Sequence, residues 1–132
     1  TLKILNLDHN QIRKLPATLG KLTRLATLNV NNNKLADFPS TLKNCKSLRI
    51  LEASGNQLSG FPEGIAFLKN LKDLKLSDNQ ISAVPAEISQ LKELRSFIIA
   101  DNRITSLPES LTELPHLELL VVSGNKLTAL PK

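Results

Sequence analysis

Few side chains of this 132-residue sequence could take part in catalysis or bind a metal. Nucleophilic catalysis needs a serine, threonine or cysteine beside a general base, and the only histidines are His9 and His116, which lie far apart in the chain. A zinc site needs three or four sulfur, nitrogen or oxygen ligands, and the only cysteine is Cys45. The five glycines form no phosphate-binding pattern. We therefore expect no enzymatic activity, no metal and no cofactor.

Asparagine and proline recur every 23 residues, which is the more informative pattern. The asparagines are Asn10, Asn33, Asn56, Asn79, Asn102 and Asn125, and the prolines are Pro16, Pro39, Pro62, Pro85, Pro108 and Pro131. An amide without hydrogen-bond partners is costly in an apolar core, so each asparagine must donate to and accept from the backbone. We therefore interpret both series as parts of the scaffold and not as binding sites.

Apolar residues repeat with the same spacing and predict the elements that carry this scaffold. The first, fourth and sixth positions of every unit are apolar, beginning with Leu2, Leu5 and Leu7, whereas the positions between them are mostly polar. This alternation is typical of a short strand with one buried face. Because every unit runs in the same direction, consecutive strands must be parallel and stacked ~4.8 Å apart.

The rest of each unit returns the chain to the start of the next strand. Proline fixes φ and lacks an N–H, which favours an extended or short 3₁₀ segment over a long helix. Apolar residues such as Leu19 and Leu22 anchor this segment to the core. Cys45 occupies one of these anchor positions, so we expect it to be buried and unreactive.

The unit L-x-x-L-x-L-x-x-N-x-L-x-x-L-P-x-x-L-x-x-L-x-x resembles the leucine-rich repeat family from Leu2 to Lys132. It is most similar to the intracellular 23-residue LPxxLxxL class of Ras-suppressor, Scribble/Erbin and Roco proteins. The resemblance implies an α/β fold in the form of a right-handed solenoid, or horseshoe. A parallel β-sheet would line its concave face, and short 3₁₀ or extended segments would form its convex face.

The repeat predicts one domain over residues 1–132. It contains five full units, 2–24, 25–47, 48–70, 71–93 and 94–116, and a partial sixth, 117–132. Solenoids usually carry polar caps, but apolar residues such as Leu2 and Leu130 occupy both ends here. We therefore expect either a segment of a longer array or end-to-end association, with a monomer as the alternative.

Composition restricts the class of partner and the cellular compartment that we expect. The formal net charge is +5, and residues 1–50 carry nine Lys and Arg against two acids, yet no aromatic platform or nucleic-acid-binding motif accompanies them. No apolar run is long enough to insert into a membrane. A single cysteine and the absence of an Asn-x-Ser/Thr sequon favour the cytoplasm, with an extracellular location as the alternative.

Function should lie on the outward positions of the strands, where the repeat leaves the residue type free. Three apolar residues there, Ile98, Leu119 and Val121, lie on adjacent predicted strands with polar residues around them, as at a contact surface. The partner-binding residues predicted on the concave face are Asn6, Asp8, Asn29, Asn31, Glu52, Ser54, Asp73, Lys75, Ser77, Ile98, Asp101, Leu119 and Val121.

We therefore expect a non-catalytic scaffold that binds a protein partner, in intracellular signalling or cytoskeletal organisation as the resemblance implies. One alternative is the ligand-binding ectodomain of a receptor. Another is the targeting domain of a larger kinase, phosphatase or ubiquitin ligase.

Overall fold

Six short strands alternate with five 3₁₀ helices along residues 1–131, the part of the chain that this computed structural model describes. The strands are β1 (Ile4–Asn6), β2 (Thr27–Asn29), β3 (Ile50–Glu52), β4 (Asp73–Lys75), β5 (Ser96–Ile98) and β6 (Leu119–Val121). The helices are η1 (Ala17–Lys21), η2 (Ser40–Asn44), η3 (Glu63–Phe67), η4 (Ala86–Gln90) and η5 (Glu109–Glu113).

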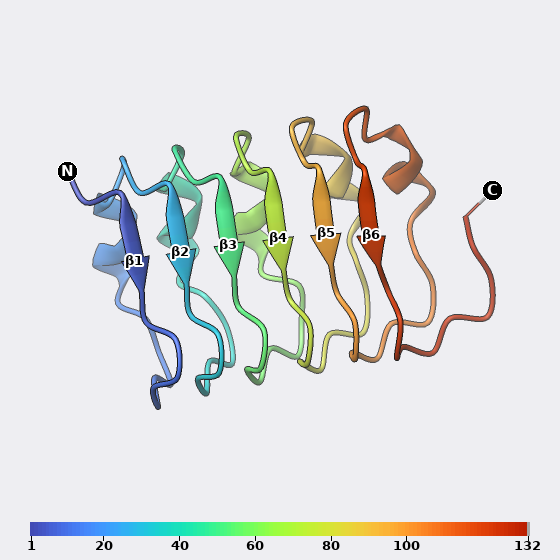
Figure 1. Ribbon diagram of the computed structural model, residues 1–132, viewed down its shortest axis with the longest axis horizontal. Helices are drawn as coiled ribbons and strands as arrows, with labels where there is room; N and C mark the ends of the chain where they lie inside the picture. The colour runs from blue at the N-terminus through green and yellow to red at the C-terminus, as the bar shows by residue number, and fades with distance from the viewer. Residues whose placement is uncertain (132) are drawn as a thin grey trace.

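The strands form one parallel, open sheet in the order of the sequence. Ile4 pairs with Thr27 and Thr27 pairs with Ile50, so every residue lies beside the residue 23 positions further along. Figure 1 shows the strands side by side on one side of the molecule and the helices on the other. The predicted parallel solenoid is therefore confirmed.

The core lies between the sheet and the helices. The middle residue of each inner strand points into it, and Leu28, Leu51, Leu74 and Phe97 are fully buried. Burial of one such side chain contributes about 1.5–3 kcal/mol, and the repeat supplies several in every turn. The end coils have a neighbour on one side only, so Leu2 and Leu130 are exposed.

The repeated asparagines hold each turn to the next, as the sequence predicts. In Asn79, Nδ2 donates to the carbonyl oxygens of Ala53 at 3.0 Å and of Leu76 at 3.1 Å. Its Oδ1 accepts the backbone N–H of Leu58 at 3.0 Å. Asn33, Asn56 and Asn102 are buried in the same way, and each satisfies backbone groups of two successive units.

The return segments are short 3₁₀ helices, and this expectation is also confirmed. Each helix follows a proline in extended conformation, as at Pro39 with φ −65° and ψ 147°. Cys45 directly follows η2 and is fully buried, with Sγ 3.4 Å from the carbonyl oxygen of Leu19. Burial raises the pKa of this thiol above its ordinary value, which keeps it protonated and unreactive.

Candidate functional site

The thirteen predicted partner-binding residues lie on the strands or in the turns that follow them. Strand register brings most of them into rows on the side of the sheet opposite the helices, which we call the strand face. One row runs through the last residue of every strand: Asn6, Asn29, Glu52, Lys75, Ile98 and Val121. Asp73 and Leu119 belong to a parallel row at the first residue of each strand.

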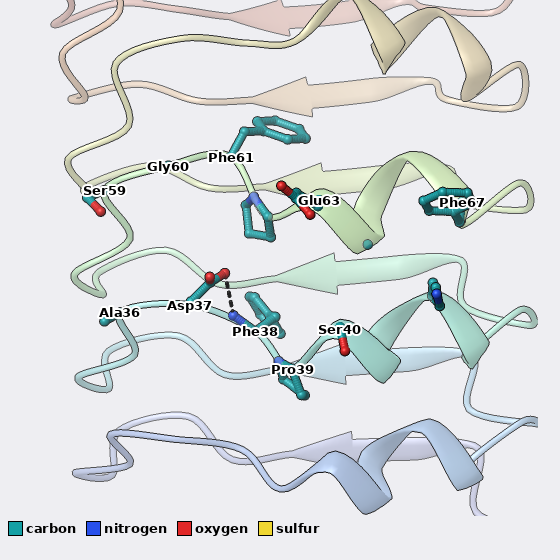
Figure 2. A pocket seen from close by; sticks show the side chains of 13 residues that line it. Ala36, Asp37, Phe38, Pro39, Ser40, Ser59, Gly60, Phe61, Glu63 and Phe67 are labelled. Atoms are coloured by element: carbon teal, nitrogen blue, oxygen red, sulfur yellow. Dashed lines mark hydrogen bonds between the residues drawn. The ribbon is translucent and has the colours of Figure 1, made fainter.

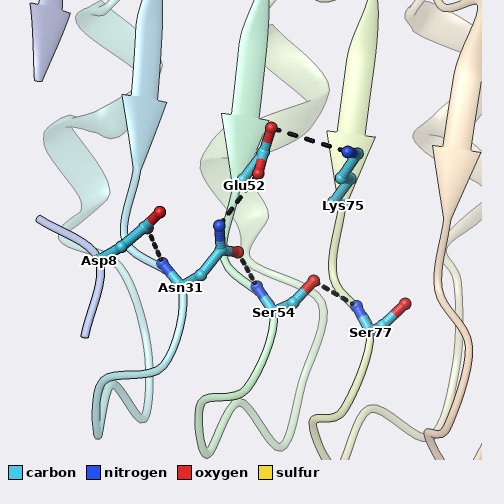
Figure 3. Close-up of polar contacts among 6 residues, drawn as sticks. All are labelled: Asp8, Asn31, Glu52, Ser54, Lys75 and Ser77. Carbon is cyan, nitrogen blue, oxygen red and sulfur yellow. Dashed lines mark hydrogen bonds and ion pairs between the residues drawn. The ribbon is translucent and has the colours of Figure 1, made fainter. Parts of the chain in front are cut away.

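A third row, just after the strands, is a ladder of hydrogen bonds (Figure 3). Asp8 Oδ1 accepts the backbone N–H of Asn31 at 2.7 Å, and Asn31 Oδ1 accepts that of Ser54 at 2.8 Å. Ser54 Oγ accepts the N–H of Ser77 at 3.1 Å, and Ser77 Oγ accepts that of Ala100 at 3.0 Å. The sequence-based interpretation treated these side chains as free to bind a partner. In the structure, one oxygen of each side chain accepts a hydrogen bond from the backbone of the next unit.

The middle of the strand face is charged but internally compensated. Glu52 accepts a hydrogen bond from Asn31 Nδ2 at 3.0 Å through Oε1, and its Oε2 lies 3.8 Å from Lys75 Nζ (Figure 3). The Lys75 side chain is 42% exposed, so the ion pair contributes little to stability. A partner would meet a charge pair here and not a single uncompensated charge.

The β5–β6 end of the strand face is apolar. Ile98 and Val121 are paired in register and half-buried, and Leu119, two residues before Val121, is 46% exposed. The predicted cluster of Ile98, Leu119 and Val121 is therefore contiguous. At the opposite end, Ile4 on β1 is 65% exposed, an apolar residue that the sequence-based site did not include.

The turn after each strand contains a residue with a left-handed backbone. These residues have φ between 55° and 68° and are His9, Asn32, Gly55, Asp78, Asp101 and Gly124. Asparagine, aspartate and glycine tolerate this conformation better than other residues do. The turn therefore restricts the residue type at Asp101, a position that the sequence-based prediction treated as free to vary. The recurrence of Asn, Asp or Gly at this 23-residue spacing could have predicted the turn from the sequence.

The opposite side of the molecule has two neighbouring hollows that the sequence did not reveal. They lie on either side of the segment Phe61–Glu63, and Phe67 borders both. The first has a volume of about 570 Å³ and lies toward η2, with Phe38 and Pro39 in its lining (Figure 2). The second has a volume of about 550 Å³ and lies toward η4.

Within residues 1–131, no three His, Cys, Asp or Glu side chains lie close enough together to hold a metal ion. His9 lies on the turn after β1, with Nε2 3.5 Å from Asn32 Nδ2, whereas His116 follows η5 near the other end of the solenoid. None of the described helices is both long enough and apolar enough to cross a membrane.

Three sequence models of one family match the chain. The model described as Leucine rich repeat matches residues 1–58, a second of two repeat copies matches residues 92–132, and a third matches residues 67–84. No curated protein matches the chain in sequence.

Solved structures with similar folds come from bacteria and plants. A leucine-rich repeat protein of Leptospira interrogans is 33% identical over 98% of the chain, with a TM-score of 0.96. An internalin from Listeria monocytogenes is 28% identical over 97% of the chain, with a TM-score of 0.82. The ectodomain of the Arabidopsis thaliana receptor kinase GASSHO1/SCHENGEN3, solved with Casparian strip integrity factor 2, is 29% identical over 95% of the chain, with a TM-score of 0.86. The chain spans 33%, 43% and 16% of these three proteins.

Proposed function

The chain is a leucine-rich repeat protein, and from this premise we propose that its strand face, the concave face of the expected horseshoe, binds a protein partner. Leucine-rich repeat domains generally mediate protein–protein interaction, and their fold is typically a non-catalytic module. The proposal assigns binding to the strand face and no chemistry to the chain.

The apolar end of the strand face is the observation that carries the proposal. Ile98, Val121 and Leu119 form one patch, and the Glu52–Lys75 pair lies beside it on the next strands. An apolar centre with a polar rim is the usual composition of a protein interface.

We place this binding in intracellular signalling or cytoskeletal organisation. The single cysteine is buried and free, and the sequence has no glycosylation sequon, as suits a reducing compartment. The LPxxLxxL form of the repeat supports the same placement. We expect the chain to bind its partner fully after incubation in reducing buffer. Loss of binding in that buffer would contradict the intracellular placement.

A peptide-binding receptor ectodomain is the second candidate. It is favoured by the likeness to two plant receptor structures, the ectodomain of GASSHO1/SCHENGEN3 with Casparian strip integrity factor 2 and the peptide hormone receptor RGFR1 with RGF2. A partner that is itself a secreted peptide would support this candidate over the intracellular scaffold.

The experiment compares two double variants against a partner captured by the wild-type chain and then purified. Ile98→Asp with Val121→Asp places carboxylates in the apolar patch, and we expect affinity to fall about 100-fold. Lys43→Glu with Lys46→Glu changes two exposed lysines on the helix side and serves as the control. Circular dichroism verifies that both variants fold. Equal loss in both, or loss only in the lysine variant, would reject the proposal.

A further inference from the structure

The helices pack unevenly along the solenoid, and η3 and η4 contact each other least among neighbouring helices. Two of the close pairs are bridged by hydroxyl groups. Thr41 Oγ1 on η2 donates to the carbonyl oxygen of Ala17 on η1 at 2.6 Å, and Ser110 Oγ on η5 donates to that of Ala86 on η4 at 2.8 Å. The equivalent residue on η4 is Glu87, which cannot donate such a bond.

Glycine explains why η2 and η3 remain close without a hydroxyl bridge. A Cβ on Gly64 would lie 3.2 Å from the backbone nitrogen of Lys43 and 3.3 Å from Leu42 Cβ. The missing side chain therefore allows η3 to approach η2. Glu87 provides neither the bridge nor the close approach, so η4 packs less closely against η3 than η2 does.

The hollow of about 550 Å³ lies between η3 and η4, and its lining is apolar with acidic residues at its border. Phe61 is fixed in the lining by the edge-on contact of its ring with Phe97, at 6.3 Å between centroids and 88° between planes. Ala66 and Ala83 are small, and Phe67 is 49% exposed. The volume falls within the range of about 300–1,000 Å³ that is usual for ligand pockets.

Charge decides what the hollow can accept. Its charged lining residues are Glu63 and Glu87, both exposed, in a chain whose formal net charge is +5. The lysines nearby are Lys69, whose Nζ donates to Gln90 Oε1 at 3.0 Å, and Lys43, which lines the first hollow. An exposed phenylalanine ring also attracts cations at its face.

We propose that the η3–η4 hollow is a second interaction site, which accepts a peptide segment of a partner protein with an apolar side chain next to lysine or arginine. The apolar side chain enters between Phe61, Phe67 and Ala83. The neighbouring cation lies against Glu63 and Glu87. This site faces away from the strand face, so one partner on each side could bind at the same time.

Two synthetic hexapeptides test the proposal. One has a leucine–phenylalanine pair flanked by lysines, and its twin has glutamates in place of the lysines. Titration into ¹⁵N-labelled protein is expected to shift the amide signals of Ala66, Phe67 and Ala83 with the lysine peptide only. The twin is expected to bind at least about tenfold more weakly.

Three variants alter the hollow in different ways. Phe67→Ala removes the aromatic wall, Glu63→Gln with Glu87→Gln removes the charge at nearly constant shape, and Glu87→Thr restores the hydroxyl that bridges other helix pairs. Each variant is expected to lower the affinity for the lysine peptide at least about tenfold. Glu109→Gln, at an exposed acid on η5, and Ile98→Asp with Val121→Asp are expected to leave peptide affinity within about twofold.

Four results would overturn the proposal. They are absence of binding by the lysine peptide at millimolar concentration, equal binding of both peptides, shifts confined to the strand face, and self-association of the free protein that Phe67→Ala abolishes. Because the double aspartate variant disables the strand face alone, failure of this site and failure of the proposed function remain distinguishable.

Discussion

The strand side and the helix side are built from the same 23-residue unit but repeat with different regularity. Each strand is hydrogen-bonded to the next through its backbone, so all five strand pairs share one register. The helices touch mainly through side chains, and their separation varies with the residue that each unit supplies, such as Thr41 or Glu87. Backbone pairing therefore imposes regularity, and side-chain contacts allow a single substitution to open a surface.

The largest expected effect comes from breaking a bond that every buried turn shares. Asn79→Ala removes the acceptor of the Leu58 N–H and the donor to Ala53 and Leu76 carbonyls, all of which are buried. Each buried group left without a hydrogen-bond partner costs about 1–3 kcal/mol, so we expect the free energy of unfolding to fall by about 3 kcal/mol. Urea denaturation followed by circular dichroism measures it.

Asn10→Ala is the matched control at the same place in the first unit. Asn10 is exposed, and its Nδ2 donates to the Leu7 and Asp8 carbonyls, which water can also reach. The expected loss is below about 1 kcal/mol. Equal losses in Asn10→Ala and Asn79→Ala would show that burial does not determine how much each repeated asparagine contributes to stability.

A smaller effect is expected when the helix side loses a bridge. Thr41→Val removes the hydroxyl that joins η2 to the Ala17 carbonyl while keeping the branched shape of the side chain. We expect a loss of about 1 kcal/mol, together with faster hydrogen exchange at Leu19 and Leu42, whose N–H groups donate to the carbonyl oxygens of Pro16 and Pro39. Faster exchange at β2 and β3 instead would show that the two sides do not differ in the way that their bonds imply.

Features fixed by one residue type at one spacing could be predicted from the sequence. The leucines predicted parallel strands, the asparagines predicted backbone satisfaction in the core, and Cys45 was predicted to be buried. Each follows because burial in the core requires an apolar residue, and because pairing with backbone donors and acceptors there requires an amide. Assignment of partner binding to the strand face stays a prediction.

Features that several residue types can provide were missed. The hydrogen-bond ladder after the strands uses an aspartate, an asparagine and two serines as acceptors, so no repeated letter marks it. The η3–η4 hollow was missed because it depends on how closely two helices pack. That packing depends in turn on Glu87, which has no hydroxyl group to bridge η4 to η3. Such properties arise from pairs of units, whereas the sequence pattern describes one unit at a time.

The smallest expected effect would extend that ladder. The Ala100 N–H donates to Ser77 Oγ, but the alanine side chain has no oxygen that could accept the N–H of Ser123 in the next unit, so the ladder ends there. Ala100→Ser adds a hydroxyl in the register that Ser54 and Ser77 occupy, and we expect a gain of about 0.5 kcal/mol in the free energy of unfolding. Urea denaturation and slower hydrogen exchange at Ser123 would measure it. A serine that destabilises the chain would mean that the terminal strand pair does not keep the geometry of the inner ones, and that backbone pairing alone does not carry regularity to the end of the sheet.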